Sequence, residues 1–228
     1  MKAQAGVSNV IGEVGWWWAV VVWVPFALYS RPFIVGDFET YRHLTIAALA
    51  GRYDVAGLHI SNHISTWQVH ALAGLVYMLV APFQLNDTLR AGHAQLHRRM
   101  GYVFVGASLI LAVSGSTTML IHSEFQSLGR IFMGFAGALN LLGLALSISA
   151  ARHKRFQAHR RWMIRSVVMG YTVISARVVL VLLQKILHIG FGVPIVKEAD
   201  YSIFVAILVS TTIVELYIHK YVSGEKVD

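Results

Sequence analysis

The sequence contains no cysteine, and only 13% of its 228 residues are charged. The missing thiols exclude disulfides, thiolate metal sites, iron–sulfur clusters and cysteine nucleophiles. Because a soluble domain carries about 25% charged residues, this chain is too poor in charge for that class. Extended polar sequence between the apolar runs is also lacking, which excludes a disordered chain, a collagen and a coiled coil.

Apolar sequence dominates instead, with 56% hydrophobic residues gathered in runs of membrane length. About 20 apolar residues cross a bilayer as a helix, and six such runs are present. The sequence therefore predicts an all-α polytopic membrane protein, one integral-membrane domain over residues 1–228. The predicted spans cover approximately residues 10–29, 66–85, 100–121, 131–150, 162–183 and 201–217.

The net charge of +8 predicts an orientation rather than a nucleic-acid partner, because the cations cluster between apolar runs. The segments after the second, fourth and sixth spans carry Arg90, Arg98, Arg99, Arg152, Lys154, Arg155, Arg160, Arg161, Lys220 and Lys226. These ends should face the cytoplasm and its anionic lipids, which places both termini inside. For a bacterial source, the location is the inner membrane.

The long connection at residues 31–65 is predicted to lie outside. It exceeds a tight turn, and residues 44–49 could form a short interfacial helix. About 35 residues with no disulfide or metal site cannot build much of a core, so an accessory domain is not expected.

A His-Arg-Arg tripeptide occurs twice, at His97 opening the third span and at His159 opening the fifth. The repeated tripeptide predicts that a helix–loop–helix unit occurs twice, with only a loose similarity between the two copies. It also predicts that spans two to five form a four-helix bundle. Small residues should let these helices approach closely: Gly74, Gly106, Gly115, Gly134, Gly137, Ala138, Gly143 and Gly170.

Arg177 lies inside the fifth predicted span, where a charge is costly unless it is paired or hydrated. It could serve a pathway, an anionic ligand or a partner helix. Alternatively, it snorkels outward or binds carbonyl groups of neighbouring helices.

His70 lies just inside the second span, in the same predicted leaflet as Arg177. The two side chains could line one polar cavity as ligands of a cofactor. We favour a buried, hydrogen-bonded histidine over a metal ligand for His70.

His97 and His159 enter from equivalent ends of two helices, as bis-histidine haem ligation requires. His93 lies four residues before His97 and would share its helix face. Because Arg-Arg follows each motif histidine, interfacial anchoring is the preferred interpretation and haem ligation the alternative.

Further polar residues near the spans have mainly structural interpretations. Lipid or another anionic group should contact Arg98, Arg99, Arg160, Arg161 and Arg165. Glu215 could pair with Arg165 across helices, and Asn140 should form an interhelical hydrogen bond. No phosphate-binding glycine loop, HExxH motif or Ser/His/Asp order is visible, which argues against hydrolase chemistry.

Five motifs occur within residues 67–180: VHALAG, APFQ, LHRRMG, HRRWMIRS and SARVVL. Together they resemble a bacterial integral-membrane family known as domain of unknown function 2306, whose most specific signature is His-Arg-x-Trp-Met-x-Arg. Ala81 and Tyr102 depart from the glycine and arginine that the family usually has there. The resemblance implies no established activity. The positions that are characteristic of the family correspond in this sequence to His70, Gln84, Arg90, His97, Arg98, His159, Arg160, Trp162, Arg165 and Arg177.

The layout, though not the motifs, is similar to six-helix b-type cytochromes. The leading hypothesis is a membrane electron-transfer component that binds haem b or quinone, with iron ligands among His70, His97 and His159. Gln84 and Arg177 complete the candidate cofactor-binding residues, and no catalytic residue is assigned. The alternatives are a non-catalytic subunit or assembly factor of a larger membrane complex, or a transporter of a small solute or ion.

Overall fold

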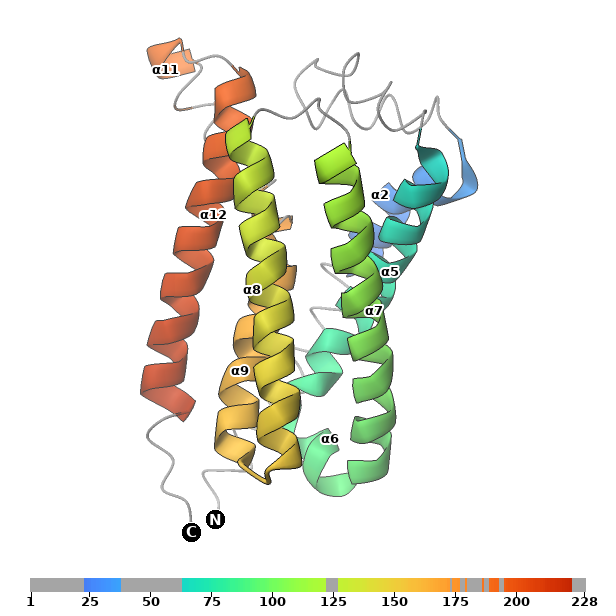
Figure 1. The fold of residues 1–228 in the computed structure, drawn as a ribbon, viewed down its shortest axis with the longest axis vertical. Coiled ribbons are helices and arrows are strands. Elements are labelled where there is room, and N and C mark those ends of the chain that lie inside the picture. Colours follow the sequence, from blue (N-terminus) through green and yellow to red (C-terminus); the bar gives the residue numbers. More distant parts are fainter. Residues whose placement is uncertain are drawn as a thin grey trace. The chain divides into compact units, whose positions relative to one another are not determined.

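The computed structural model describes residues 23–37, 63–121, 127–172, 174–176, 179, 186, 189–192 and 195–222. Within these ranges every regular element is a helix, which confirms the all-α prediction (Figure 1). The chain divides into two compact units, Met1–Ser114 and Gly115–Asp228, and each is considered by itself below. A single integral-membrane domain with a central four-helix bundle stays a prediction.

Four helices among the described residues are long and apolar enough to cross a membrane: Ile64–Gln84, Ala94–Thr117, Leu128–Arg152 and Ile203–Val222. They correspond to the second, third, fourth and sixth predicted spans. Most of the first predicted span lies outside the described residues, and the fifth is described continuously only as far as Thr172. The count of six spans and the orientation of the termini stay predictions.

Several helices extend beyond the apolar runs from which they were predicted. Helix α2, Val24–Val35, continues into the predicted outer loop, and α7, Ala94–Ile121, begins six residues before the predicted span. Helix α12, Ile195–Tyr217, likewise begins early. Helical hydrogen bonds join backbone groups, so a helix can continue where the side chains become polar.

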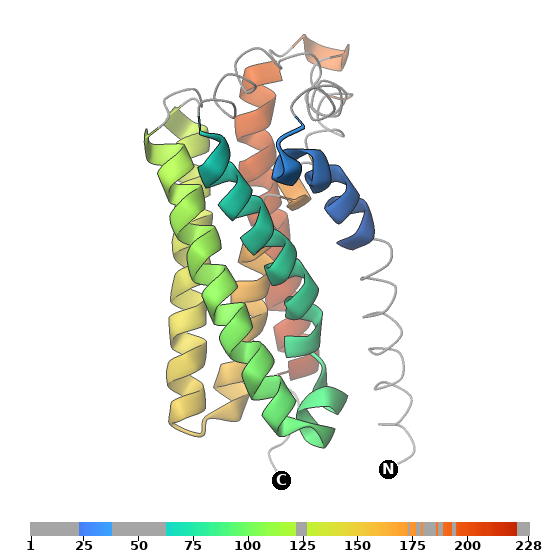
Figure 2. The ribbon, with the colours of Figure 1, turned by 90° about the vertical axis from the view of Figure 1, so that its right-hand side faces the viewer.

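In the first unit, α5 (Ile64–Gln84) and α7 run antiparallel and are joined through the short α6 (Asp87–Gly92) (Figure 2). The rings of Tyr77 and Phe104 meet midway, with centroids 4.7 Å apart. Both residues are almost fully buried, as expected for two helices that pack along a stripe of inward-facing positions. Hydrogen bonds of polar side chains lie at the two ends of this seam.

Helix α2 packs antiparallel on α5 through two side-chain hydrogen bonds to backbone carbonyls. Trp23 Nε1 donates to Leu75 O at 3.0 Å, and Gln68 Nε2 donates to Ile34 O at 2.9 Å. Each bond satisfies a polar group that would be costly to leave unpaired in an apolar environment.

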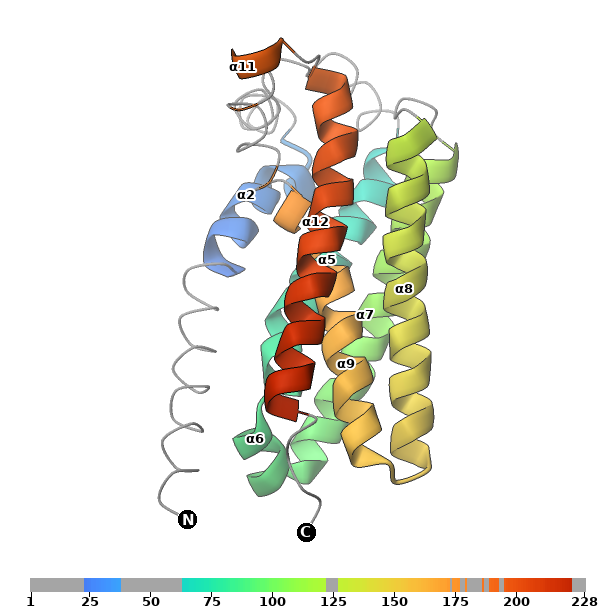
Figure 3. The same ribbon diagram turned by 90° about the vertical axis from the view of Figure 1, so that its left-hand side faces the viewer.

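The second unit is built from α8 (Ser127–Arg152), α9 (Phe156–Gly170) and α12, which all contact one another (Figures 1 and 3). A tight turn joins α8 to α9, so these two helices run antiparallel. Phe132 and Phe204 join α8 to α12 with ring centroids 5.1 Å apart. The short α11 (Ile189–Phe191) precedes α12, and the π-helical η3 (Ile218–Val222) follows it.

Only part of the predicted small-residue packing is present among the described helices. A Cβ added at Gly143 would lie 3.2 Å from backbone atoms of Ser166, so α8 and α9 approach most closely there. A Cβ added at Gly106, Gly134 or Gly137 would meet nothing within 4 Å. The prediction was wrong for these three residues, because small size does not by itself show which helix face has a neighbour.

Candidate functional site

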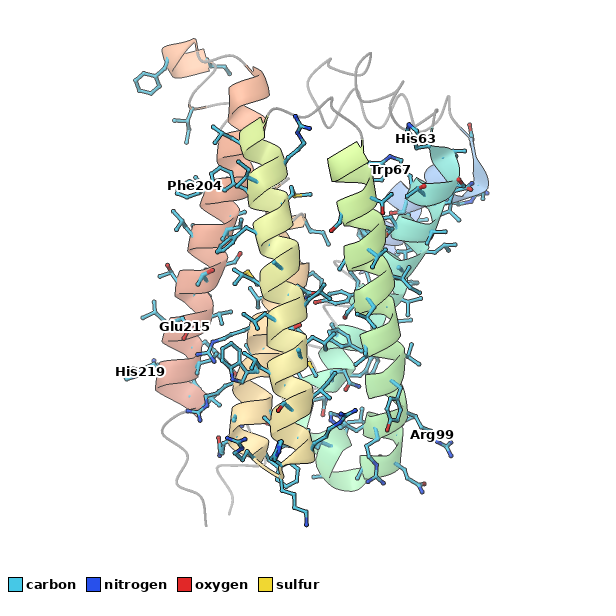
Figure 4. The ribbon with its side chains drawn as sticks, in the orientation of Figure 1. His63, Trp67, Arg99, Phe204, Glu215 and His219 are labelled. Carbon is cyan, nitrogen blue, oxygen red and sulfur yellow. The ribbon has the colours of Figure 1, made fainter. Side chains whose placement is uncertain are left out.

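His70 lies nearly two turns into α5, where it is partly buried and joined to α7. Its Nδ1 is 3.0 Å from Ser114 Oγ, and Trp67 meets the imidazole edge-on with centroids 5.6 Å apart. Figure 4 labels His63 and Trp67 at this end of α5. The predicted hydrogen-bonded histidine is confirmed.

The partner of Ser114 determines which nitrogen of neutral His70 carries the proton. Ser114 Oγ donates its one proton to Ile110 O at 2.6 Å, because a carbonyl oxygen can only accept. The hydroxyl therefore accepts from His70 Nδ1. In the neutral ring Nε2 then carries the lone pair and is the accepting nitrogen.

His159 lies in the first turn of α9 and contacts Ser147 of α8. Its Nδ1 is 3.0 Å from Ser147 O and 2.8 Å from Ser147 Oγ. Because the carbonyl only accepts, Nδ1 again carries the proton and Nε2 the lone pair. The same tautomer thus occurs at one histidine in each unit.

His97 lies in the first turn of α7, and its backbone carbonyl accepts from Gln84 Nε2 at 3.3 Å. Gln84 is buried at the end of α5, so its amide joins the two helices. His93 is the C-cap of α6 and lies outside α7. His97 N donates to His93 O at 3.0 Å, but His93 itself is not helical, with φ of −137° and ψ of 58°, so the prediction that both side chains share a helix face was wrong.

The two His-Arg-Arg motifs open equivalent helices in the two units. In each case a polar side chain of the preceding long helix donates to the backbone carbonyl of the motif histidine. Gln84 does so for His97, and Ser147 Oγ donates to His159 O at 3.2 Å. These matching contacts support the predicted duplication.

The remaining arginines of the candidate set differ in how exposed they are. Arg98 and Arg99 are exposed at the start of α7, and Figure 4 labels Arg99 there. Arg160 and Arg161 are partly buried at the start of α9. Arg177 lies outside the described residues, so its predicted role stays a prediction.

Arg165 and Glu215 form a two-pronged ion pair between α9 and α12, which confirms their predicted pairing. Nε and Nη2 of Arg165 donate to Oε1 and Oε2 of Glu215 at 2.6 and 2.7 Å. Trp162 lies under the guanidinium, 4.7 Å from ring centroid to Cζ. Figure 4 shows Glu215 one turn before His219. The anionic group that the Arg165 guanidinium binds is thus the Glu215 carboxylate of the same chain.

Replacing Arg165 or Glu215 with glutamine should lower the free energy of unfolding in detergent by about 1 kcal/mol. Because either change breaks the same pair, the double variant should lose much less than the two single losses combined. A double-mutant cycle by denaturant titration measures this coupling. The exposed pair Asp87–Arg90, three residues apart in one helix, is the control and should show weaker coupling. Additive losses at Arg165 and Glu215 would contradict a coupled pair.

Asn140 forms the predicted interhelical hydrogen bond and is buried midway along α8. Its Nδ2 donates to Ser166 O at 2.7 Å, and Ser166 Oγ donates back to Asn140 O at 3.0 Å. Asn140 Nδ2 and Ser166 Oγ thereby each have a partner on the other helix, which gives Asn140 a structural role.

Sequence reasoning did not single out Ser114, Ser147 or Ser166, although each binds a candidate polar residue. Serine is common at helix interfaces in membranes, so its presence alone gave little signal. The spacing of buried positions along α8 would have placed Asn140 and Ser147 on one face, seven residues apart.

The described residues contain no group of three or more histidine or acidic side chains arranged to hold a metal ion. Haem iron has different requirements, because the porphyrin supplies four nitrogens and the protein only one or two axial ligands.

A comparison with protein families matches residues 67–225 to the family described as predicted membrane protein (DUF2306). The match covers both His-Arg-Arg motifs and all four candidate membrane spans except the first residues of α5. Comparisons with curated proteins and with solved structures gave no match.

Proposed function

We propose that this chain, which belongs to the DUF2306 family of predicted membrane proteins, is an electron-transfer component that binds haem b through histidine Nε2 atoms. The observation that carries the proposal is the shared tautomer of His70 and His159. In each, Nδ1 donates to a serine of a neighbouring helix, so the neutral ring carries its lone pair on Nε2, the nitrogen through which we propose that it binds iron. Histidines that ligate metals are usually held in this way.

The same hydrogen bonds favour haem over quinone as the bound group. A neutral His70 cannot donate from Nε2 to a quinone carbonyl, because its proton is on Nδ1. The imidazole could instead ligate iron, to which haem adds reversible one-electron chemistry. Ser114 and Ser147 orient the rings, and Gln84 and Asn140 hold the helices that carry them.

The proposed location is a bacterial inner membrane, with both His-Arg-Arg motifs at the cytoplasmic face. Basic segments follow the second and fourth spans, as the positive-inside rule requires. His70 lies at the other end of its helix from that face. A haem at His70 and one at His159 would then belong to opposite leaflets.

Purified protein from cells supplied with ample haem should show a b-type band in its dithionite-reduced minus oxidised spectrum. His70→Ala and His159→Ala should each remove part of this band, because each deletes one proposed iron ligand. His97→Ala tests the third candidate. Ser114→Ala should retain the band and shift its midpoint potential, since it removes the acceptor at His70 Nδ1.

His153 provides a matched control for the spectra. Its Nδ1 also binds a backbone carbonyl, Ser149 O at 2.8 Å, but the residue is exposed in the turn after α8. His153→Ala should leave the band unchanged.

A flat spectrum from folded wild-type protein would contradict the proposal, and co-purification with a larger complex would then favour a non-catalytic subunit. Stabilisation by a particular solute would favour a transporter.

A further inference from the structure

The turn between α8 and α9 holds a lysine in a backbone conformation that favours glycine. Lys154 has φ of 58°, and its N donates to Ala151 O at 3.0 Å. Arg155 N donates to Ala150 O at 2.9 Å, which completes a Schellman motif. A side chain in this left-handed conformation costs energy that glycine would avoid. The turn thus keeps a cation at the position where its backbone favours glycine.

The surroundings of Lys154 are strongly cationic. Arg152, Lys154 and Arg155 are all exposed, and we call them the turn cations. The sequence from 127 to 192 contains no aspartate or glutamate, so no acidic residue near in sequence offsets them. Phe156 follows directly and is 62% exposed. An exposed aromatic ring beside several cations is typical of segments that lie at a membrane interface.

We propose that the turn cations bind the phosphate groups of anionic lipids at the bilayer surface, with Phe156 lying among the headgroups. The turn joins α8, a candidate membrane span, to α9, so a bilayer surface lies beside it. Anionic headgroups attract basic residues near a membrane, and an aromatic ring gains by entering the interface. The exposed ring favours a bilayer over an acidic soluble protein as the occupant.

The absence of native cysteine allows a clean test with one reporter. His153→Cys in the full chain, labelled with an environment-sensitive dye, would be reconstituted in nanodiscs of phosphatidylcholine with or without phosphatidylglycerol. Headgroup-spin-labelled phosphatidylglycerol should quench the dye more than spin-labelled phosphatidylcholine does. Replacing the three turn cations with glutamine should remove this preference, since each contributes about fivefold to the attraction.

Two further variants separate lipid binding from folding and from net charge. Lys154→Gly should weaken the preference about fivefold while stabilising the turn, because glycine relaxes the positive φ. Arg130→Gln removes one cation at the opposite end of α8 and should leave quenching at residue 153 unchanged. Equal quenching by both lipids would overturn the proposal, as would full quenching with the turn cations removed. If an added acidic protein abolished the preference for phosphatidylglycerol while added inorganic phosphate did not, the turn would be assigned to a protein partner instead.

Discussion

Replacing Gly143 with valine is expected to lower the free energy of unfolding by about 3 kcal/mol. A Cβ at this position lies 3.2 Å from the Cα, Cβ and N of Ser166, and backbone atoms cannot rotate away. The helices α8 and α9 would have to separate, which would also lengthen the hydrogen bonds between Asn140 and Ser166. Denaturant titration in detergent measures the loss.

Gly137 is the matched control because it lies on the same helix, and an added Cβ there meets nothing within 4 Å. Gly137→Val should therefore change stability by less than about 1 kcal/mol, a difference of helix propensity alone. Equal losses at the two positions would show that the close contact of α8 with α9 does not limit the size of residue 143.

Phe104→Ala should have an effect of similar size in the first unit, about 3 kcal/mol. The ring is completely buried and packs against Tyr77, whose exposed fraction is only 1%. Removing it leaves a void that the helix backbones on either side cannot close, so the contacts that join α5 to α7 midway are lost. Thermal unfolding of the purified variant gives the change.

Phe135→Ala makes the same chemical change at a phenylalanine that is 53% exposed on α8. Because few packing contacts are lost there, the effect should be below about 1 kcal/mol. If Phe135→Ala were as destabilising as Phe104→Ala, the loss would reflect the general removal of apolar area rather than the packing of α5 against α7.

Hydrophobic runs were sufficient to predict the four described helices that could cross a membrane, because the cost of unpaired backbone groups in lipid leaves few alternatives to a helix. Two contacts were also predictable. Arg165 and Glu215 are opposite charges near the same predicted end of their spans, and each would be costly alone. Asn140 is a polar residue midway along an apolar helix, which needs a partner for the same reason.

Other contacts could not be read from the sequence, since they depend on how each helix is rotated about its axis. Gly143 and Gly137 look alike in the sequence, yet only Gly143 faces a neighbouring backbone. The tautomers of His70 and His159 depend on Ser114 and Ser147, which lie 44 and 12 residues away from them. Hydropathy contains no information on either pairing.

The tight turn at Lys154 has a consequence for biogenesis. Joining α8 to α9 through so short a connection costs little loop-closure entropy, so this hairpin can form as soon as both helices leave the ribosome. The polar groups of Asn140, Ser147, His159 and Ser166 then satisfy one another before they meet lipid. We expect α8 and the more polar α9 to enter the bilayer as a pair, so that the translocon inserts the two helices together rather than in succession.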